Sequence, residues 1–458
     1  MSRLFVVSNR VAVPNADKPA AGGLAMALNG ALEQYGGIWF GWSGTTRRDA
    51  STEVTVIDQG KAGFALIDLD RKDYDDFYKG YANRSLWPLF HFRTDLTVFE
   101  PHYRDAYQRV NRQFAERMLP LLRPDDLIWI HDYHLIPCAR ELRDRGCQQR
   151  IGFFLHIPFP GPQVLTASPD HRQLVEALFS YDLVGFQTEA DVRALRDYVL
   201  ELADGREEPD GRLTAFGRTI RAQAFPIGME VEQYIASAGS AEVAGYHDAI
   251  RQHLSGQQLL IGLDRLDYSK GIPERLAGFA ELLAGREDYC GKITLLQLAA
   301  ASREDVPEYA RIRKQVETRV GRINGQFGQV DWVPVRYMNQ TIPREQVIGL
   351  LRASRLSLVT PLRDGMNLVA KEYVAAQNPD DPGVLVLSHF AGAADQCRDA
   401  ALMVNPYDAH EIAAAIDQGL TMSIAERQER WQSLLRTVKD YDIHWWRTAF
   451  IDTLQNTH

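Results

Sequence analysis

Short apolar runs alternate with longer amphipathic segments along nearly the whole chain. The runs are rich in Val, Ile, Leu and Phe, and the segments between them repeat apolar residues at helical spacing, as after Arg109 and after Glu242. Apolar strands separated by helices predict parallel sheet that is covered on both faces. We expect such strands to begin near Leu4, Asp126, Ile151, Leu183, Leu259, Lys292, Val330, Leu356 and Gly383.

The alternation weakens between residues 201 and 221 and restarts at Leu259. A chain of 458 residues is also longer than the chains that usually fold around a single hydrophobic core. We therefore expect an α/β protein with two Rossmann-like domains, residues 1–240 and 241–440. The aromatic last segment, residues 441–458, is expected to form a helix that crosses back to the N-terminal domain. Residues 45–93 are expected to add a hairpin and loops to the first domain.

The composition narrows the class of protein. With 45% hydrophobic and 24% charged residues it is typical of soluble proteins, and a net charge of −9 argues against coating nucleic acid or anionic membranes. The N-terminal apolar run is too short for a signal peptide and no segment reaches the length of a membrane span, so we expect a cytoplasmic protein. The four cysteines include no CxxC pair, which favours reduced thiols over disulfides or a zinc site.

A glycine pair follows the first predicted strand, in AAGGLAMAL, and a helix is expected to open at Gly23. Paired glycines let backbone N–H groups approach an anion at a helix start, although a flexible turn with a helix cap gives the same pattern. The stretch is not GxGxxG, and no obvious acidic partner for a ribose follows about twenty residues later, which argues against NAD.

Two cations flank the turn after the strand at Leu259, in GLDRLDYSKGIPERL. Arg265 and Lys270 would meet at one point if the turn folds back, and two cations at a strand end suit a diphosphate better than a carboxylate. Alternatively, both are solvated surface charges that pair with Asp264 and Asp267. Their position at a strand-to-helix boundary favours the first interpretation.

The stretch LVTPLRDGMNLVAKEYVAAQ places a strand, a polar turn and a helix in succession. We expect the N–H groups of Asn367, Leu368 and Val369 at the helix N-terminus, where they would bind an anion. Glu372 could accept hydrogen bonds from ribose hydroxyls, or could be an exposed helix residue that pairs with Lys371 or another neighbour. Asp364, in the turn, is a candidate to hold sugar hydroxyls.

Histidine and aspartate residues follow two consecutive strands, in IWIHDYHLIP and FFLHIPFP. His131, Asp132, His134 and His156 are residue types that bind metals. No HxxxH helix and no obvious further carboxylate complete such a site, so no metal is expected there.

Aromatic residues in a predicted loop form another candidate. Tyr78 and Trp87 are expected either to pack locally or to form the wall of a small sugar pocket. Arg303 follows the strand predicted at Lys292.

Together these motifs resemble the trehalose-6-phosphate synthases. The similarity is carried, in order along almost the whole chain, by VVSNR, AGGL, LWPLFH, IWIHDYHL, GFFLHIPFP, RLDYSKGIPER, GRINGQFG and TPLRDGMNLVAKEY. It implies a retaining glucosyltransferase of the GT-B architecture, in which two Rossmann-like domains with parallel sheets face each other across a deep cleft. It also implies transfer of glucose from UDP-glucose, or another nucleoside diphosphate glucose, to glucose 6-phosphate without a metal or cofactor.

The resemblance further implies a role for individual residues. Those expected in catalysis are Arg265, Lys270, Asp132 and His156. The nucleotide-sugar donor would be held by Gly23, Arg265, Lys270, Asp364, Asn367, Leu368, Val369 and Glu372. Glucose 6-phosphate would be held by Arg10, Tyr78, Trp87, Asp132 and Arg303. The family's front-face mechanism needs no protein nucleophile, whereas a double-displacement glycosidase needs paired carboxylates.

Other functions remain to be compared with this one. A pseudo-glycosyltransferase that couples cyclitols, a silent sugar-phosphate sensor, and an epimerase or polymerising transferase would share the fold, but the intact donor and acceptor residues favour the synthase. Met229 after PIG, and His389 with Cys397, depart from the family pattern. They leave the donor base open among uridine, guanosine and adenosine, and the chain is compatible with a homo-oligomer.

Overall fold

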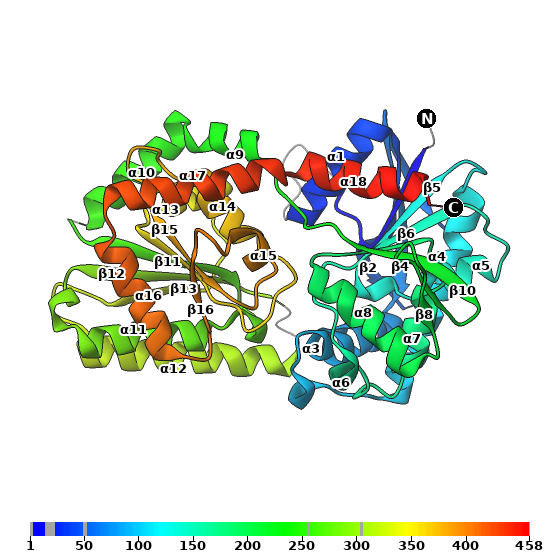
Figure 1. Ribbon diagram of the computed structural model, residues 1–458, viewed down its shortest axis with the longest axis horizontal. Coiled ribbons are helices and arrows are strands. Elements are labelled where there is room, and N and C mark those ends of the chain that lie inside the picture. The colour runs from blue at the N-terminus through cyan, green and yellow to red at the C-terminus, as the bar shows by residue number, and fades with distance from the viewer. Residues whose placement is uncertain (1–2, 14–22, 49–52, 255, 303–305, 458) are drawn as a thin grey trace. The chain divides into compact units, whose positions relative to one another are not determined.

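The protein divides into two compact units (Figure 1). The structure, a computed structural model, describes residues 3–13, 23–48, 53–254, 256–302 and 306–457. Unit 1 comprises Met1–Pro226 and Trp446–His458, and unit 2 comprises Ile227–Trp445. The chain therefore changes units after Pro226, earlier than the boundary expected after residue 240.

Unit 1 is built on a ten-stranded sheet. Its strands are, in spatial order, β3 (Thr55–Gln59), β4 (Ala62–Asp70), β2 (Gly37–Arg47), β1 (Leu4–Arg10), β5 (Leu127–His131), β6 (Arg150–Phe154), β7 (Leu183–Phe186), β10 (Arg218–Ala224), β9 (Leu213–Ala215) and β8 (Arg206–Glu207). The strands from β4 to β10 pair in parallel, while β3, β9 and β8 extend the two ends with antiparallel pairs. The central strands β1 and β5 are buried along nearly their whole length, which explains their continuous apolar sequences.

The helices of unit 1 connect these strands. They are α1 (Gly23–Tyr35), α2 (Arg71–Asp73), the π-helix η1 (Tyr74–Leu86), α3 (Trp87–Phe90), η2 (Thr94–Leu96), α4 (Pro101–Met118), η3 (Leu119–Leu121), η4 (Tyr133–Leu135), α5 (Cys138–Arg143), α6 (Pro162–Leu165), α7 (His171–Leu178) and α8 (Glu189–Leu202). The last helix, α18 (Ile443–Gln455), belongs to unit 1 from Trp446 onward.

Aromatic residues of α18 fill the core of unit 1. The rings of Trp446 and Phe450 lie 4.9 Å and 4.7 Å from that of Trp129 in β5. Gly152 and Gly185 make room for Phe450, because a Cβ at either position would lie within 2.8 Å of its ring. The close fit explains why the aromatic end of the chain is buried.

Unit 2 has a six-stranded sheet in which every pair is parallel. Its spatial order is β13 (Val335–Met338), β12 (Ile293–Ala300), β11 (Gln258–Arg265), β14 (Leu356–Val359), β15 (Val384–Ser388) and β16 (Leu402–Val404). This is the 3-2-1-4-5-6 order of a doubly wound Rossmann sheet, which reverses between β11 and β14. The expected α/β class, with a Rossmann-like sheet in each half, is confirmed.

Helices cover both faces of this sheet (Figure 1). They are α9 (Val231–Ala238), α10 (Ala241–Leu254), η5 (Tyr268–Lys270), α11 (Ile272–Gly285), η6 (Glu287–Tyr289), α12 (Pro307–Phe327), α13 (Arg344–Ala353), α14 (Leu368–Ala376), α15 (Ala394–Cys397), α16 (Ala409–Thr421) and α17 (Ile424–Asp440). Helices α11, α12 and α16 pack together on one face, and α10, α13, α14 and α17 lie on the other. In the described parts of the chain, no helix combines the length and apolar character needed to cross a membrane.

Two expectations about local structure are wrong. The hairpin expected after residue 45 forms as β3 and β4, but residues 71–90 are helical rather than loop. The helical stretch begins after Asp70, whose side chain accepts from the backbone N–H groups of Lys72 and Asp73. Tyr78 and Trp87 therefore lie on helices. The strand expected at Val330 starts only at Val335, and Val330 is fully exposed in the preceding turn.

Candidate functional site

In each unit, predicted site residues follow the two strands between which the strand order reverses. In unit 1 Arg10 ends β1 and Asp132 directly follows β5. In unit 2 Arg265 ends β11 and Asp364 lies in the turn after β14. Open α/β sheets bind their ligands at this point. Each unit therefore carries a candidate binding edge of its own.

In unit 2 a buried ion pair lies at this edge. The Lys270 Nζ is 2.5 Å from Oδ2 of Asp364, and the two side chains are only 11% and 13% exposed. The side-chain amide of Asn367 donates to the same carboxylate oxygen at 3.0 Å. The turn behind Lys270 requires Gly271, since φ is +63° there and a Cβ would collide with the carbonyl oxygen of Thr360.

An arginine that the sequence analysis missed holds this edge together. Arg275 of α11 is completely buried, and its Nη1 donates to Oδ2 of Asp264 at 2.5 Å and to Oε1 of Gln297 at 2.9 Å. Its Nε donates to Oγ1 of Thr360 at 3.0 Å, and its Nη2 to the carbonyl of Lys270 at 3.4 Å. One guanidinium thus joins the end of β11, the middle of β12 and the residue after β14 to the turn that carries Lys270.

These contacts test the alternative in which both cations are solvated surface charges. Asp264 is engaged by the buried Arg275, and Asp267 accepts a hydrogen bond from Tyr309 at 2.8 Å. Lys270 is 9% exposed and faces Asp364. The alternative in which Lys270 is a solvated surface charge is therefore wrong, while Arg265 is exposed at the end of β11.

The start of α14 offers donors for an anion, as expected. Asn367 has φ +75° and ψ +82°, and the helix begins at Leu368 and Val369. The first N–H groups of a helix have no acceptor within it. Asn367 Oδ1 is also buried without a hydrogen-bond partner in the described part of the chain. An anion with neighbouring hydroxyl donors would satisfy both kinds of group.

Glu372 lies one turn into α14 and is half-buried. Burial raises the pKa of its carboxyl, and the nearby Arg344 opposes that rise. The expected alternative partner, Lys371, points into the interior, where its Nζ donates to the carbonyl of Ile227 at 2.8 Å. The pairing of Glu372 with Lys371 is therefore wrong. Burial lowers the pKa of Lys371 to about 8.

In unit 1 Asp132 has an unusual backbone conformation, with φ +74°. Its N–H donates to the carbonyl of Phe154 at 2.8 Å, and its Oδ1 accepts from the N–H of His156 at 3.3 Å. Non-glycine residues with positive φ are strained by about 1–3 kcal/mol and concentrate at functional sites. The carboxylate is thus fixed beside the backbone of His156.

His156 and His131 form a pair, in which His131 is fully buried and His156 is half-buried. Nε2 of His156 lies 3.1 Å from Nδ1 of His131. Burial lowers the pKa of both rings, to about 3 for His156, and for His131 the proximity of His156 adds to the effect. Both imidazoles are therefore neutral at pH 7.

His134 does not join these residues in a metal site. Its ring stacks on Tyr78 with centroids 5.7 Å apart and planes 12° apart. Among the described residues, no group of three or more His, Cys, Asp or Glu side chains is arranged to hold a metal ion.

Arg10 and Tyr78 are brought together by an aromatic residue that the sequence analysis missed. The Arg10 guanidinium lies 5.8 Å from the ring of Trp42 in β2, and that ring lies 6.2 Å from Tyr78. Trp87 is 4% exposed and contacts Tyr133, the residue after Asp132, at 5.7 Å. Arg10 and Tyr78 thus belong to one cluster. Trp87 instead packs against the segment that carries Asp132.

Two predicted residues remain. Gly23 begins α1 in unit 1, so a helix does open at the glycine pair. Arg303 lies outside the described residues.

The fold and these edges define a class of protein. Two Rossmann-like sheets, each with charged and hydrogen-bonding side chains where the strand order reverses, are typical of enzymes that bind nucleotides and phosphorylated sugars. The chain belongs to glycosyltransferase family 20, whose model matches residues 4–456. It is a glycosyltransferase, and the expected GT-B fold class is confirmed.

Individual relatives match over their full length. The trehalose-6-phosphate synthase of Klebsiella pneumoniae subsp. pneumoniae is 46% identical over 456 residues, which cover 100% of this chain and 96% of that protein. An alpha,alpha-trehalose-phosphate synthase (UDP-forming) from Burkholderia xenovorans, crystallised in complex with glucose-6-phosphate, is 47% identical with a TM-score of 0.95, covering 99% of this chain and 100% of the other. A structure from E. coli bound with UDP-2-fluoro glucose is 46% identical with a TM-score of 0.94, covering 99% of both chains.

Proposed function

We propose that this chain transfers glucose from UDP-glucose to glucose 6-phosphate, which gives trehalose 6-phosphate and UDP. Membership of glycosyltransferase family 20 and the full-length similarity to UDP-forming synthases support the reaction. The observation in this chain that carries the proposal is the binding edge of unit 2. There Arg265, Lys270 and the start of α14 offer positive charge and N–H donors to a diphosphate.

Unit 2 is proposed to bind the donor. Arg265 and Lys270 would contact the diphosphate together with the N–H groups of Asn367, Leu368 and Val369, and Gly23 of unit 1 would also contact the donor. Asp364 would hold hydroxyls of the transferred glucose and Glu372 those of the ribose. The position of Asp364 against Lys270 supports this assignment, because one side chain can meet the sugar while the other meets its phosphate.

Unit 1 is proposed to bind the acceptor. Arg10 would meet the phosphate of glucose 6-phosphate with Tyr78 beside it, and Asp132 would accept hydrogen bonds from sugar hydroxyls. Trp87 and Arg303 would complete this pocket. His156, whose imidazole is neutral at pH 7, would contact the transferred glucose as an uncharged hydrogen-bonding group.

The proposed chemistry retains configuration without a protein nucleophile. The bond between C1 of glucose and the diphosphate oxygen breaks, and the C1 bond to the acceptor oxygen forms on the same face. The leaving phosphate oxygen takes the acceptor proton. Arg265, Lys270 and the N-terminus of α14 would stabilise the charge that develops on the diphosphate, which is the kind of interaction that accelerates a reaction most.

Metal independence is part of the proposal. The cations and backbone donors of unit 2 would supply the positive charge that a divalent ion supplies in other transferases. Turnover should be unchanged after exhaustive treatment with chelator, and a loss that a divalent ion restores would contradict this part of the proposal.

A product assay by carbon NMR tests the reaction itself. Purified protein is mixed with glucose 6-phosphate and, in parallel, UDP-, GDP- or ADP-glucose. An α,α-1,1-linked disaccharide phosphate, formed fastest from UDP-glucose, is expected. The absence of product while glucose 6-phosphate still binds would favour a sugar-phosphate sensor.

Substitution of Lys270 tests the site. Lys270→Ala should lower turnover by at least ~100-fold, the typical loss when a transition-state donor is removed. Lys292→Ala provides a matched control, because Lys292 is exposed and precedes β12 at the opposite edge of the same sheet. Equal turnover of the two variants would remove Lys270 from catalysis.

A further inference from the structure

A cavity lies in unit 2, at the amino ends of its strands, and has a volume of about 360 Å³. Gln258 begins β11, Arg355 directly precedes β14 and Gly383 directly precedes β15, and all three line the cavity. The proposed donor edge lies at the carboxyl ends of the same strands. Since the eight residues of β11 span about 23 Å, the cavity is separate from that edge.

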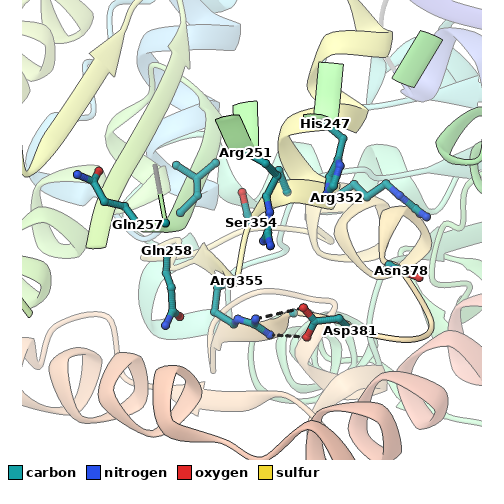
Figure 2. A pocket seen from close by; sticks show the side chains of 13 residues that line it. His247, Arg251, Gln257, Gln258, Arg352, Ser354, Arg355, Asn378 and Asp381 are labelled. Carbon is teal, nitrogen blue, oxygen red and sulfur yellow. Dashed lines mark hydrogen bonds and ion pairs between the residues drawn. The ribbon is translucent and has the colours of Figure 1, made fainter. Parts of the chain in front are cut away.

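The cavity is strongly cationic. Arg251 comes from α10, Arg352 from the last turn of α13, and Arg355 directly precedes β14. Asp381 is the one carboxylate among the described lining residues. Figure 2 shows Arg251 reaching from its helix toward Arg355, whose guanidinium lies against Asp381. The lining residues therefore include three arginines and a single carboxylate.

Two of the arginines, Arg352 and Arg251, have no carboxylate partner among the described residues. The Nη1 of Arg352 donates to the carbonyls of Ala376 and Gln377, at 3.0 Å and 3.3 Å, which are neutral acceptors. Burial lowers the pKa of Arg352, since no carboxylate offsets the loss of solvent. Arg251 is exposed and forms no ion pair within the described parts of the chain. An anion between these residues would gain from both charges.

The third arginine can be shared with a ligand. Nη1 and Nη2 of Arg355 donate to the two oxygens of Asp381 at 3.0 Å and 3.3 Å. Arg427 of α17, whose side chain is 8% exposed, donates to the same carboxylate at 2.7 Å. Arg355 could therefore turn toward an anion without leaving Asp381 unpaired, which removes the main cost of such a rearrangement.

The backbone around the cavity is fixed by hydrogen bonds from α14 and from Gln377, the residue that follows it. The hydroxyl of Tyr373 donates to the carbonyls of Ser354 and Arg355 at 3.0 Å and 3.2 Å. The side chain of Gln377 accepts from the N–H of Gly383 at 2.8 Å and donates to the carbonyl of Leu351 at 2.9 Å. The segments that present the arginines are thus held in place before any ligand binds, which lowers the entropic cost of binding.

We propose that this cavity binds a sugar phosphate at a site separate from that of glucosyl transfer. The surplus of guanidinium groups suits the dianionic phosphate, for which their donor geometry is well matched. The side-chain amides of Gln258 and Asn378 at the rim can bond sugar hydroxyls. The described lining residues include no Phe, Tyr or Trp, and their one aromatic ring is the imidazole of His247, whose Nδ1 lies 2.9 Å from Oδ1 of Asp248. The absence of a large aromatic platform for a nucleobase favours a sugar phosphate over a nucleotide.

Calorimetric titration of the full chain with glucose 6-phosphate tests the proposal, with two variants that each disturb only the cavity. Arg251→Glu reverses an exposed charge, and Gln258→Glu adds a negative charge at nearly constant volume. Each should weaken one class of binding site by at least ~10-fold, about the effect of losing a charged hydrogen bond. Arg436→Glu is the matched control, because Arg436 is an exposed helical arginine of the same unit outside the cavity.

The count of sites separates the outcomes. Two sites in the native chain, with one weakened by both cavity variants and none by the control, support the proposal. A single site that both variants weaken also supports binding in the cavity. That result would instead contradict the proposal that unit 1 binds glucose 6-phosphate as the acceptor. Binding that neither variant affects overturns the proposal. Inorganic phosphate that competes as well as glucose 6-phosphate for this site would overturn the assignment to a sugar phosphate.

Discussion

Replacement of Arg275 by methionine should destabilise unit 2 severely. The substitution keeps most of the side-chain volume but removes the guanidinium that bonds Asp264, Gln297, Thr360 and the carbonyl of Lys270. Asp264, whose side chain is 3% exposed, would then be a buried carboxylate without its cation. Breaking such a pair costs about 3–5 kcal/mol of unfolding free energy.

A double variant separates lost charge pairing from lost packing. Asp264→Asn in the Arg275→Met background replaces the unpaired carboxylate with a neutral amide, so it should recover at least about 1 kcal/mol. Arg313→Met is the control, since Arg313 and Glu317 form an exposed pair one helical turn apart in α12 and its loss should cost no more than about 0.5 kcal/mol.

Urea unfolding followed by circular dichroism measures all four proteins, and the proposed transferase activity is measured in parallel. Activity should fall in Arg275→Met even under conditions where the variant is fully folded, because the strand ends and the Lys270 turn are no longer tied together. A loss of stability no larger than that of Arg313→Met would refute the reasoning. So would a double variant that recovers nothing.

Three further predictions concern buried groups and a turn. Because Lys371 has a folded pKa of about 8 against 10.5 when unfolded, the unfolded chain binds more protons in that range. In urea titrations the unfolding free energy should therefore rise between pH 8 and 10.5, by up to about 3 kcal/mol more than that of Lys371→Met. Parallel curves of unfolding free energy against pH for the two proteins would contradict this. Burial lowers the pKa of His131 and of His156, so the unfolding free energy should fall as the pH drops below about 6.5. The fall should reach up to ~1.4 kcal/mol per pH unit for each ring. His156→Gln should reduce that slope. Gly271→Ala should cost at least about 1 kcal/mol and lower turnover, whereas Gly285→Ala, which meets no neighbouring atom, should be neutral; equal melting temperatures would refute the role given to Gly271.

The strands that could be predicted from the sequence are those whose run of apolar residues follows from burial alone. β5, β11, β12, β14 and β15 are buried on both faces, so their apolar runs stand out from the helices between them. Candidate residues were then found by their position directly after such strands. This reasoning placed Arg265, Lys270 and Asp364 at one edge without any knowledge of tertiary contacts.

Elements and residues whose role depends on distant partners were missed. β2 reads GIWFGWSGTTR, in which three glycines interrupt the apolar pattern, because Gly37 and Gly41 pass too close to β1 for any side chain. Because β2 was not predicted, its residue Trp42 was not recognised as a candidate either. Arg275 gave only a faint signal, since it shares the helix face of Ile272 and Phe279, where an apolar residue would be expected. Its four partners come from four different segments of the chain, which no local pattern reveals.

The two units use the same device where their strand order reverses. Asp132 in unit 1 and Asn367 in unit 2 are non-glycine residues with φ of +74° and +75°, each beyond the carboxyl end of a central strand. Glycine would relieve about 1 kcal/mol of strain at either position. The strain is explained if the side chains themselves are needed: the Asp132 carboxylate accepts from His156, and the Asn367 amide donates to Asp364 while its oxygen still lacks a partner among the described residues. Both edges thus give up some stability to hold polar groups in a fixed orientation, because a freely rotating side chain would have to lose conformational freedom when a ligand binds.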